Sequence, residues 1–163
     1  FQTPPGRMKL IAGIKNTQII DDTYNASPVA ALSALEVLGK LEAKRKIAVL
    51  GDMLELGNYT EKAHRQMGEK AKETANLIFL IGERVLFAAE EAKAQGFDPA
   101  KIFEFVNSEE AKKIIQEQIQ EGDLILVKGS QAMRMEKIVE EIMAEPERAK
   151  ELLVRQDENW KKK

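Results

Sequence analysis

The chain has 163 residues, of which 25 are Lys or Arg and 27 are Asp or Glu, so its formal net charge is −2. This length and a hydrophobic content of 44% suit one folded domain, and the balanced charge gives no sign of a nucleic-acid-binding surface. The chain has no cysteine, which excludes disulfides and thiolate metal sites. No apolar run approaches the roughly 20 residues of a transmembrane helix. We therefore expect a cytoplasmic domain that neither enters a membrane nor binds nucleic acid.

The first six residues contain two prolines and a glycine, a composition typical of an extended connector. The chain also begins with Phe1 rather than Met. We therefore expect residues 1–6 to be a linker from a missing upstream domain. Residues 7–163 should form the domain itself.

Strand-like and helix-like runs alternate along this domain. Short apolar, β-branched runs predict strands over residues 8–14, 17–22, 46–50, 77–81, 101–106 and 124–127. Apolar residues three or four apart predict helices over residues 28–41, 60–71, a stretch ending near 95, 107–119, 135–142 and 146–160. The pattern predicts an α/β fold. It is a Rossmann-like three-layer sandwich around a mostly parallel sheet of about six strands.

Local signals mark where several of these elements begin. Lys15-Asn16 separates the first two runs and predicts a tight hairpin, so one edge of the sheet should be antiparallel. Ser27 before Pro28 predicts the N-cap and the first residue of a helix. Thr60 and Asn107 are the expected caps of two later helices.

Polar residues gather where the second predicted strand ends. Asp21 and Asp22 are followed by Thr23, Tyr24 and Asn25, which lie at the carboxyl edge of the sheet, where open α/β sheets bind ligands. The two carboxylates could coordinate magnesium or accept hydrogen bonds from ribose hydroxyl groups. No third oxygen ligand can be placed, so a solvated acidic strand end is the better interpretation and we assign no metal site.

A second polar group follows the last predicted strand. Lys128-Gly129-Ser130 combines a cation, a permissive turn and a hydroxyl ahead of a helix, whose free N–H groups would also favour an anion. This combination suits a carboxylate or a phosphate. The alternative is a surface lysine beside a turn.

Three glycines, Gly51, Gly82 and Gly129, directly follow predicted strands on the same edge. Glycine allows a ligand or another backbone to approach closely, although it is also common in any strand-to-helix turn. The three together favour a ligand-binding edge.

The single histidine, His64, lies beside an apolar helix stripe and is expected to be structural or to order the loop over residues 52–57. Met133, Met135 and Met143 are expected to pack in the core. The sequence contains neither G-x-G-x-x-G nor a P-loop, so it has no triphosphate-binding motif of its own.

Residues 22–28, Asp-Thr-Tyr-Asn-Ala-Ser-Pro, resemble the D-x-Y-N-A-x-P signature of the C-terminal domain of Mur ligases. Two later stretches agree in order and spacing: residues 51–57 followed by His64, and residues 127–130 followed by Met133 and Glu136. The resemblance covers nearly the whole chain but only the last third of such an enzyme. It is strongest to the branch that adds D-alanyl-D-alanine to UDP-N-acetylmuramoyl-tripeptide in peptidoglycan precursor synthesis.

The resemblance implies an ATP-dependent amide ligase, in which this domain contacts the nucleotide through Asp22, Tyr24 and Asn25. It implies that Lys128 and Ser130 hold the carboxylate of the dipeptide. The P-loop and most of the Mg²⁺ contacts would belong to the missing central domain, and a missing N-terminal domain would be the other partner. The fragment alone is expected to be inactive, and no catalytic residue is assigned within it.

Two alternatives remain open from the sequence. A phospho-receiver-like signalling module also has an early acidic pair and a late lysine. However, it needs a phosphorylatable Asp on its middle strand, where this chain runs from Ile81 into Gly82-Glu83. Another Mur or folylpolyglutamate-type ligase would keep the fold and change the substrate. The Tyr24-Asn25 pair and the loop over residues 51–57 argue against that alternative.

Overall fold

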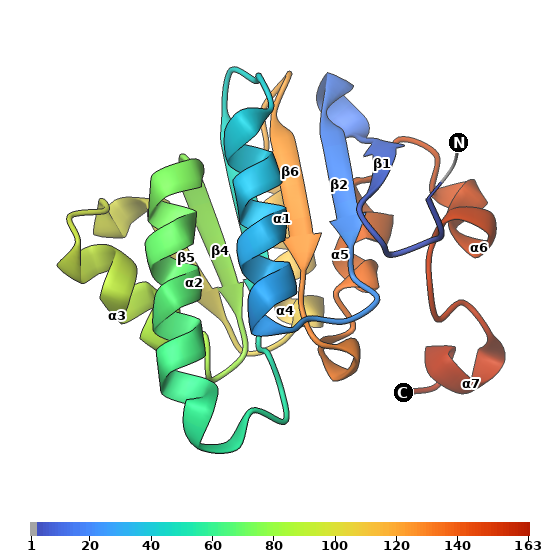
Figure 1. Cartoon of the computed structure of the whole chain (residues 1–163). Helices are drawn as coiled ribbons and strands as arrows, with labels where there is room; N and C mark the ends of the chain where they lie inside the picture. The colour runs from blue at the N-terminus through green and yellow to red at the C-terminus, as the bar shows by residue number, and fades with distance from the viewer. Residues whose placement is uncertain (1–2) are drawn as a thin grey trace.

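Six strands form one mixed sheet in the computed structural model, which describes residues 3–163 (Figure 1). The strands are β1 (Lys9–Ala12), β2 (Gln18–Asp22), β3 (Lys46–Gly51), β4 (Leu77–Ile81), β5 (Ile102–Phe105) and β6 (Leu124–Lys128). Their order across the sheet is β1-β2-β6-β3-β4-β5, with β1 antiparallel to β2 and all other pairs parallel. The expected mostly parallel sheet with an antiparallel edge hairpin is confirmed.

Helices cover both faces of the sheet. They are α1 (Pro28–Lys40), α2 (Thr60–Thr74), α3 (Leu86–Ala94), α4 (Ser108–Gln118), α5 (Glu136–Ile142), α6 (Ala149–Leu152) and α7 (Glu158–Lys161). One core cluster lies between the sheet and α1, α2 and α3, and the other lies between the sheet and α4, α5 and α6. Figure 1 shows α1 and α2 in front of the sheet and α4 and α5 behind it. This is the three-layer sandwich that the alternating pattern predicts.

The antiparallel hairpin forms, although residues 13–17 connect its strands through a 3-10 helix, Ile14–Asn16, instead of a tight turn at Lys15-Asn16. Two of the helix starts form as their local signals predict. Lys15 and Asn16 turn the chain between β1 and β2 with left-handed backbone angles, φ 55° and 56°. Ser27 Oγ accepts a hydrogen bond from the Ala30 N–H at 3.2 Å, and Asn107 Oδ1 accepts one from the Glu110 N–H at 2.9 Å. These side chains satisfy N–H groups that the first helical turn leaves free.

The expected cap at Thr60 is wrong. A short 3-10 helix, Gly57–Tyr59, leads directly into α2, so Thr60 is already helical. Its hydroxyl instead donates to the Gly57 carbonyl oxygen at 2.7 Å. The helix therefore begins from the preceding 3-10 turn, and Thr60 is not its cap.

The predicted final helix over residues 146–160 is also wrong, because the chain breaks it into short pieces. A 3-10 turn, Pro146–Arg148, precedes α6, and residues 153–157 leave the helical path before α7 begins. Leu153 is buried in the second core cluster, and Arg155 adopts a left-handed backbone, φ 55°. These tertiary contacts outweigh the helical preference of the charged segment.

The order of the strands creates crevices at their carboxyl ends. The chain leaving β2 or β3 turns to the face covered by α1 and α2, whereas the chain leaving β6 turns to the face covered by α5. Because β6 lies between β2 and β3, the loops diverge on both of its sides. Ligands of open α/β sheets bind at such points.

The expected linker, residues 1–6, lies partly outside the described residues, which begin at Thr3. Gly6 is buried, and its carbonyl oxygen accepts a hydrogen bond from the Tyr24 N–H at 2.9 Å. Contacts with the rest of the domain thus begin by Gly6. Within residues 3–163, no helix combines the length and the apolar character that a bilayer crossing requires.

Candidate ligand site at the carboxyl edge of the sheet

Two neighbouring clefts flank the chain that leaves β6. The first cleft, about 550 Å³, is bordered by α1 and lined among others by Arg7, Asp22, Tyr24 and Lys128. The second cleft, about 520 Å³, is lined among others by Leu54, Glu55, Ser130, Arg134 and Trp160. Asn25 and Ala26 line both clefts, so the loop after β2 forms the wall between them.

Asp22 and Lys128 form an ion pair in the first cleft. Lys128 Nζ lies 2.7 Å from Asp22 Oδ2 and also donates to the Asn25 carbonyl oxygen at 3.0 Å. The other carboxylate oxygen, Asp22 Oδ1, accepts a hydrogen bond from the Met8 N–H at 3.2 Å. The lysine side chain is 4% exposed. Both residues therefore have a role in the fold that the sequence pattern did not reveal.

The side chains of Tyr24 and Asn25 are available to a ligand. Tyr24 is 47% exposed, and the Arg7 guanidinium lies 4.0 Å from the centre of its ring. The exposed Asn25 side chain sits at the rim of both clefts, while its backbone oxygen is held by Lys128. An aromatic ring and a guanidinium can both stack on a planar base. The sequence analysis missed Arg7, because its place beside Tyr24 depends on the path of the chain before β1.

Ser130 lies in the second cleft, separated from Lys128. Its residue exposure is 5%, and its Oγ accepts a hydrogen bond from the Leu54 N–H at 2.9 Å. A 3-10 helix, Gln131–Met133, follows it, and α5 starts only at the buried Glu136. The helix that directly follows Ser130 is thus a three-residue 3-10 turn rather than α5, and the anion preference expected there stays a prediction.

The three edge glycines are needed for packing. A Cβ atom on Gly129 would lie 2.7 Å from Met135 Cγ and 3.1 Å from the Gly51 Cα. A Cβ atom on Gly82 would lie 2.5 Å from the Asp52 carboxylate, whose oxygens accept the Glu83 and Val85 N–H groups. Close approach is required here, as the sequence suggested, but the approaching groups belong to the protein itself.

His64 joins α2 to the loop after β3. Its Nε2 accepts a hydrogen bond from the Met53 N–H at 3.0 Å, and its Nδ1 donates to the Thr60 carbonyl oxygen at 2.7 Å. Burial lowers the pKa of His64 below its usual 6.5, which favours this neutral tautomer. His64 is thus both a structural residue of α2 and the residue that orders the loop over residues 52–57.

The three methionines singled out from the sequence pack against the second core cluster. Met135 and Met143 are fully buried, and Met133 is partly buried. The expectation of core packing is confirmed.

The carboxylates of Asp21 and Asp22 lie on opposite faces of β2, as successive residues of a strand do. Asp21 is buried, which raises the pKa of its carboxyl group to about 6, although the Thr23 hydroxyl donates to it at 2.6 Å. The pair cannot converge on one ion. Among residues 3–163, no group of three or more His, Cys, Asp or Glu side chains is placed to hold a metal.

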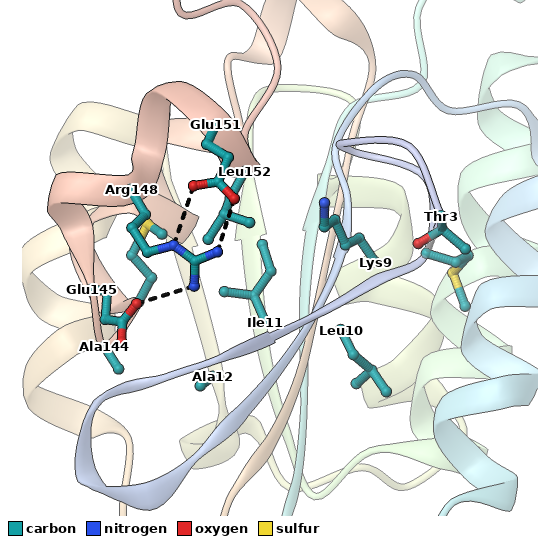
Figure 2. Close-up of a pocket in the computed structure, with 12 residues that line it drawn as sticks. Thr3, Lys9, Leu10, Ile11, Ala12, Ala144, Glu145, Arg148, Glu151 and Leu152 are labelled. Carbon is teal, nitrogen blue, oxygen red and sulfur yellow. Dashed lines mark hydrogen bonds and ion pairs between the residues drawn. The ribbon is translucent and has the colours of Figure 1, made fainter. Parts of the chain in front are cut away.

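A further cavity, of about 480 Å³, lies along the edge strand β1 (Figure 2). Figure 2 shows Arg148 beside Glu145 and Glu151 on one side of it. The two ion pairs have N···O distances of 3.1 Å and 2.9 Å. None of the candidate site residues lines this cavity. The two clefts at the carboxyl edge remain the candidate site.

The chain is similar to several known proteins. A family model described as "Mur ligase, glutamate ligase domain" matches residues 6–131. The chain is 33% identical over 142 residues to the UDP-N-acetylmuramoyl-tripeptide--D-alanyl-D-alanine ligase of Bacillus subtilis. It is 34% identical over 136 residues to the enzyme of the same name from Escherichia coli. These matches cover 86% and 83% of this chain but only 31% and 29% of the relatives.

Solved structures of related ligases resemble the fold of this chain. The MurF ligase from Thermotoga maritima in complex with ADP matches with a TM-score of 0.71 at 28% identity, covering 86% of this chain and 31% of that one. A folylpolyglutamate synthase from the same organism matches with a TM-score of 0.56 at 14% identity, a likeness of fold alone. The chain spans less than a third of the length of its curated relatives and of the MurF structure. Because the family model covers most of the chain, the chain belongs to the Mur ligase family and corresponds to its C-terminal domain.

Proposed function

We propose that this chain is the C-terminal domain of a MurF-type ligase, which uses ATP to join D-alanyl-D-alanine to UDP-N-acetylmuramoyl-tripeptide. The observation that carries this proposal is the 33% identity, over 86% of the chain, to a ligase with that name. The ADP in the Thermotoga maritima structure supports ATP as the nucleotide. The step would belong to peptidoglycan precursor synthesis in the cytoplasm.

The first cleft would take the base and ribose of the nucleotide. The exposed Tyr24 ring under Arg7 offers a stacking surface, and the Asn25 amide can donate and accept at the rim. Asp22 lines the same cleft, and a ribose hydroxyl would share its oxygens with Lys128 and Met8. The chain has no P-loop, so the phosphates and Mg²⁺ would be held mainly by the missing central domain.

The second cleft would take the dipeptide, with Ser130 as a hydrogen-bond donor to its carboxylate. The ligase reaction transfers the γ-phosphoryl group of ATP to the carboxylate of the tripeptide. The dipeptide amine then attacks that acyl phosphate, forming the amide and releasing phosphate. This domain would close over the intermediate and keep water away from it.

The experiment compares the full-length ligase with its Asn25→Ala and Tyr24→Ala variants. Each variant should raise the KM for ATP about three- to tenfold, the effect of one lost hydrogen bond or stacking contact, with little change in the KM for the dipeptide. Asn58→Ala is the matched control, because Asn58 is also exposed but lies away from both clefts.

Two results would contradict the proposal, each at a different level. If phosphate release from ATP does not depend on both the tripeptide substrate and the dipeptide, the proposed reaction is wrong. If the reaction is as proposed but both variants keep the normal KM for ATP, only the nucleotide assignment of the first cleft is wrong.

A further inference from the structure

A buried ionic cluster folds the C-terminal segment back onto the second cleft. Glu136 is 1% exposed, and its two carboxylate oxygens accept from Arg134 Nε at 2.5 Å and from Arg155 Nη2 at 2.8 Å. Arg155 also donates to the carbonyl oxygens of Thr23 and Tyr24. One carboxylate thus connects the start of α5, the C-terminal segment and the loop after β2.

The geometry of this cluster indicates that it holds side chains in position rather than stabilising the fold. Removing charges from water is costly, so a buried carboxylate between two guanidinium groups is weak evidence of a gain in stability. Arg134 and Arg155 both adopt left-handed backbone angles, φ 53° and 55°, which residues other than glycine rarely do. Such strained positions are concentrated at functional sites. All three residues lie beyond the stretch that the family model matches.

Arg134 is the guanidinium that faces the second cleft. Its Nε is bound to Glu136, and its Nη1 donates to the Trp160 carbonyl oxygen at 2.7 Å. Within residues 3–163 its Nη2 has no acceptor, and the Trp160 ring lies 5.2 Å from the guanidinium carbon. The cluster therefore fixes an arginine that lines the cleft and leaves its Nη2 without an acceptor among the described residues.

Ser130 offers a second donor in the same cleft. Because its Oγ accepts from the Leu54 N–H, its own proton remains to be donated, and no acceptor for it occurs in the described part of the chain. The side chain is more than nine-tenths buried and lines the cavity. The other charged groups of this cleft are Glu55 and Lys163, so cations outnumber carboxylates there.

Lys128 cannot serve as the cation of this cleft. Its ammonium is buried on the first cleft and held by Asp22 and the Asn25 carbonyl. We propose that Arg134, rather than Lys128, binds the carboxylate of the incoming amine substrate together with Ser130. Glu136 and Arg155 act as positioning residues. This inference rests on the proposed function and names the residue that binds the substrate carboxylate.

The test uses the full-length ligase with two substrates, D-alanyl-D-alanine and its C-terminal amide. The unmodified enzyme should prefer the free carboxylate, because the guanidinium makes charge-assisted hydrogen bonds with a carboxylate and only a weaker, neutral one with a carboxamide oxygen. Arg134→Gln should lower kcat/KM for the dipeptide about 10- to 100-fold and should largely abolish the preference. The KM for ATP should stay unchanged.

Matched variants separate binding from folding. Arg134→Lys keeps the charge and should restore part of the preference. Arg148→Gln removes another arginine that binds two carboxylates, but at the distant cavity of Figure 2, and should change nothing. Glu136→Gln should reduce the ratio of kcat/KM for the dipeptide to that for its amide, a ratio that does not depend on how much of the enzyme is folded. A merely structural Glu136 would instead lower the turnover of both substrates equally.

Each contrary outcome has its own meaning. If Arg134→Gln keeps the preference for the carboxylate, or raises the KM for ATP instead, the assignment of Arg134 is wrong. If the unmodified ligase does not use the dipeptide at all, the proposed function is wrong and the assignment falls with it.

Discussion

Lys128 carries its ammonium group into the carboxyl edge of the sheet with only 4% of its side chain exposed. The positive charge of this buried ammonium is compensated by the Asp22 carboxylate and by one backbone carbonyl oxygen. A buried charge that loses its partner costs far more than an exposed one, because water cannot replace the lost contact. Asp22 is thus both a candidate nucleotide contact and a support of the fold.

Replacing Asp22 should therefore destabilise the domain. Asp22→Ala leaves the buried ammonium unpaired and should lower the free energy of unfolding by about 3–5 kcal/mol, measured by urea denaturation. The double variant Asp22→Ala/Lys128→Met should recover most of that loss. Glu36→Ala, which breaks an exposed pair with Lys40, is the control and should have no measurable effect. A loss below about 1 kcal/mol for Asp22→Ala would show that the ammonium is solvated without its partner.

At the scale of elements, α2 orders the loop after β3 through one imidazole. His64 must be neutral to accept from the Met53 N–H while donating to the Thr60 carbonyl. Protonation would place a second N–H group against the Met53 N–H and would break this connection. The loop carries Leu54 and Glu55, which line the second cleft, so the imidazole supports the wall of that cleft.

This contact makes stability depend on pH. Burial lowers the pKa of His64 in the folded state below 6.5, so the unfolded chain binds the proton more tightly. The stabilisation is complete above pH 6.5 and is lost progressively as the pH falls toward the folded-state pKa. Since His64 is the single histidine of the chain, an NMR titration of its imidazole should give a midpoint below 6.5.

The comparison with a His64→Gln variant isolates this effect. Asp21 acts in the opposite direction, because burial raises the pKa of its carboxyl group to about 6 and stability falls as the pH rises from 3.8 to 6. The difference in unfolding free energy between the two proteins removes the contribution of Asp21. A difference that stays constant from pH 7 down to pH 5 would contradict the role assigned to His64.

At the scale of the whole molecule, two clefts lie at one edge of a domain that corresponds to only part of its relatives. It spans less than a third of its curated relatives, and its sequence has no P-loop. Both clefts lie at the carboxyl edge of the sheet, and Trp160 of α7 and Lys163 line the second one. Under the proposed function, a further domain would complete the site.

The isolated chain should have no ligase activity and only weak affinity for ATP. In the proposed assignment it contacts the base and ribose but has no P-loop to surround the phosphates. Phosphate release should stay at background with all substrates present, and calorimetry should find a Kd well above that of the full-length ligase. Sub-micromolar binding of ATP by the isolated chain would be the contrary result.

Much of the fold can be predicted from local patterns. The apolar runs placed all six strands, and the turn at Lys15-Asn16 marked the antiparallel edge. Ser27 and Asn107 cap their helices as expected, because a cap involves residues only three positions apart. The family resemblance stated from residues 22–28 is confirmed, because the family model matches residues 6–131 and includes that stretch.

Long-range contacts account for what the sequence alone does not predict. The order of the strands, the pairing of Lys128 with Asp22 106 positions away, and the break of the C-terminal helix over residues 153–157 all depend on such contacts. Periodicity and capping act over a few residues, so they specify which elements form and where. Burial, ion pairing and the divergence of loops around β6 arise only when distant segments pack together, and these place Lys128 and Ser130 in different clefts.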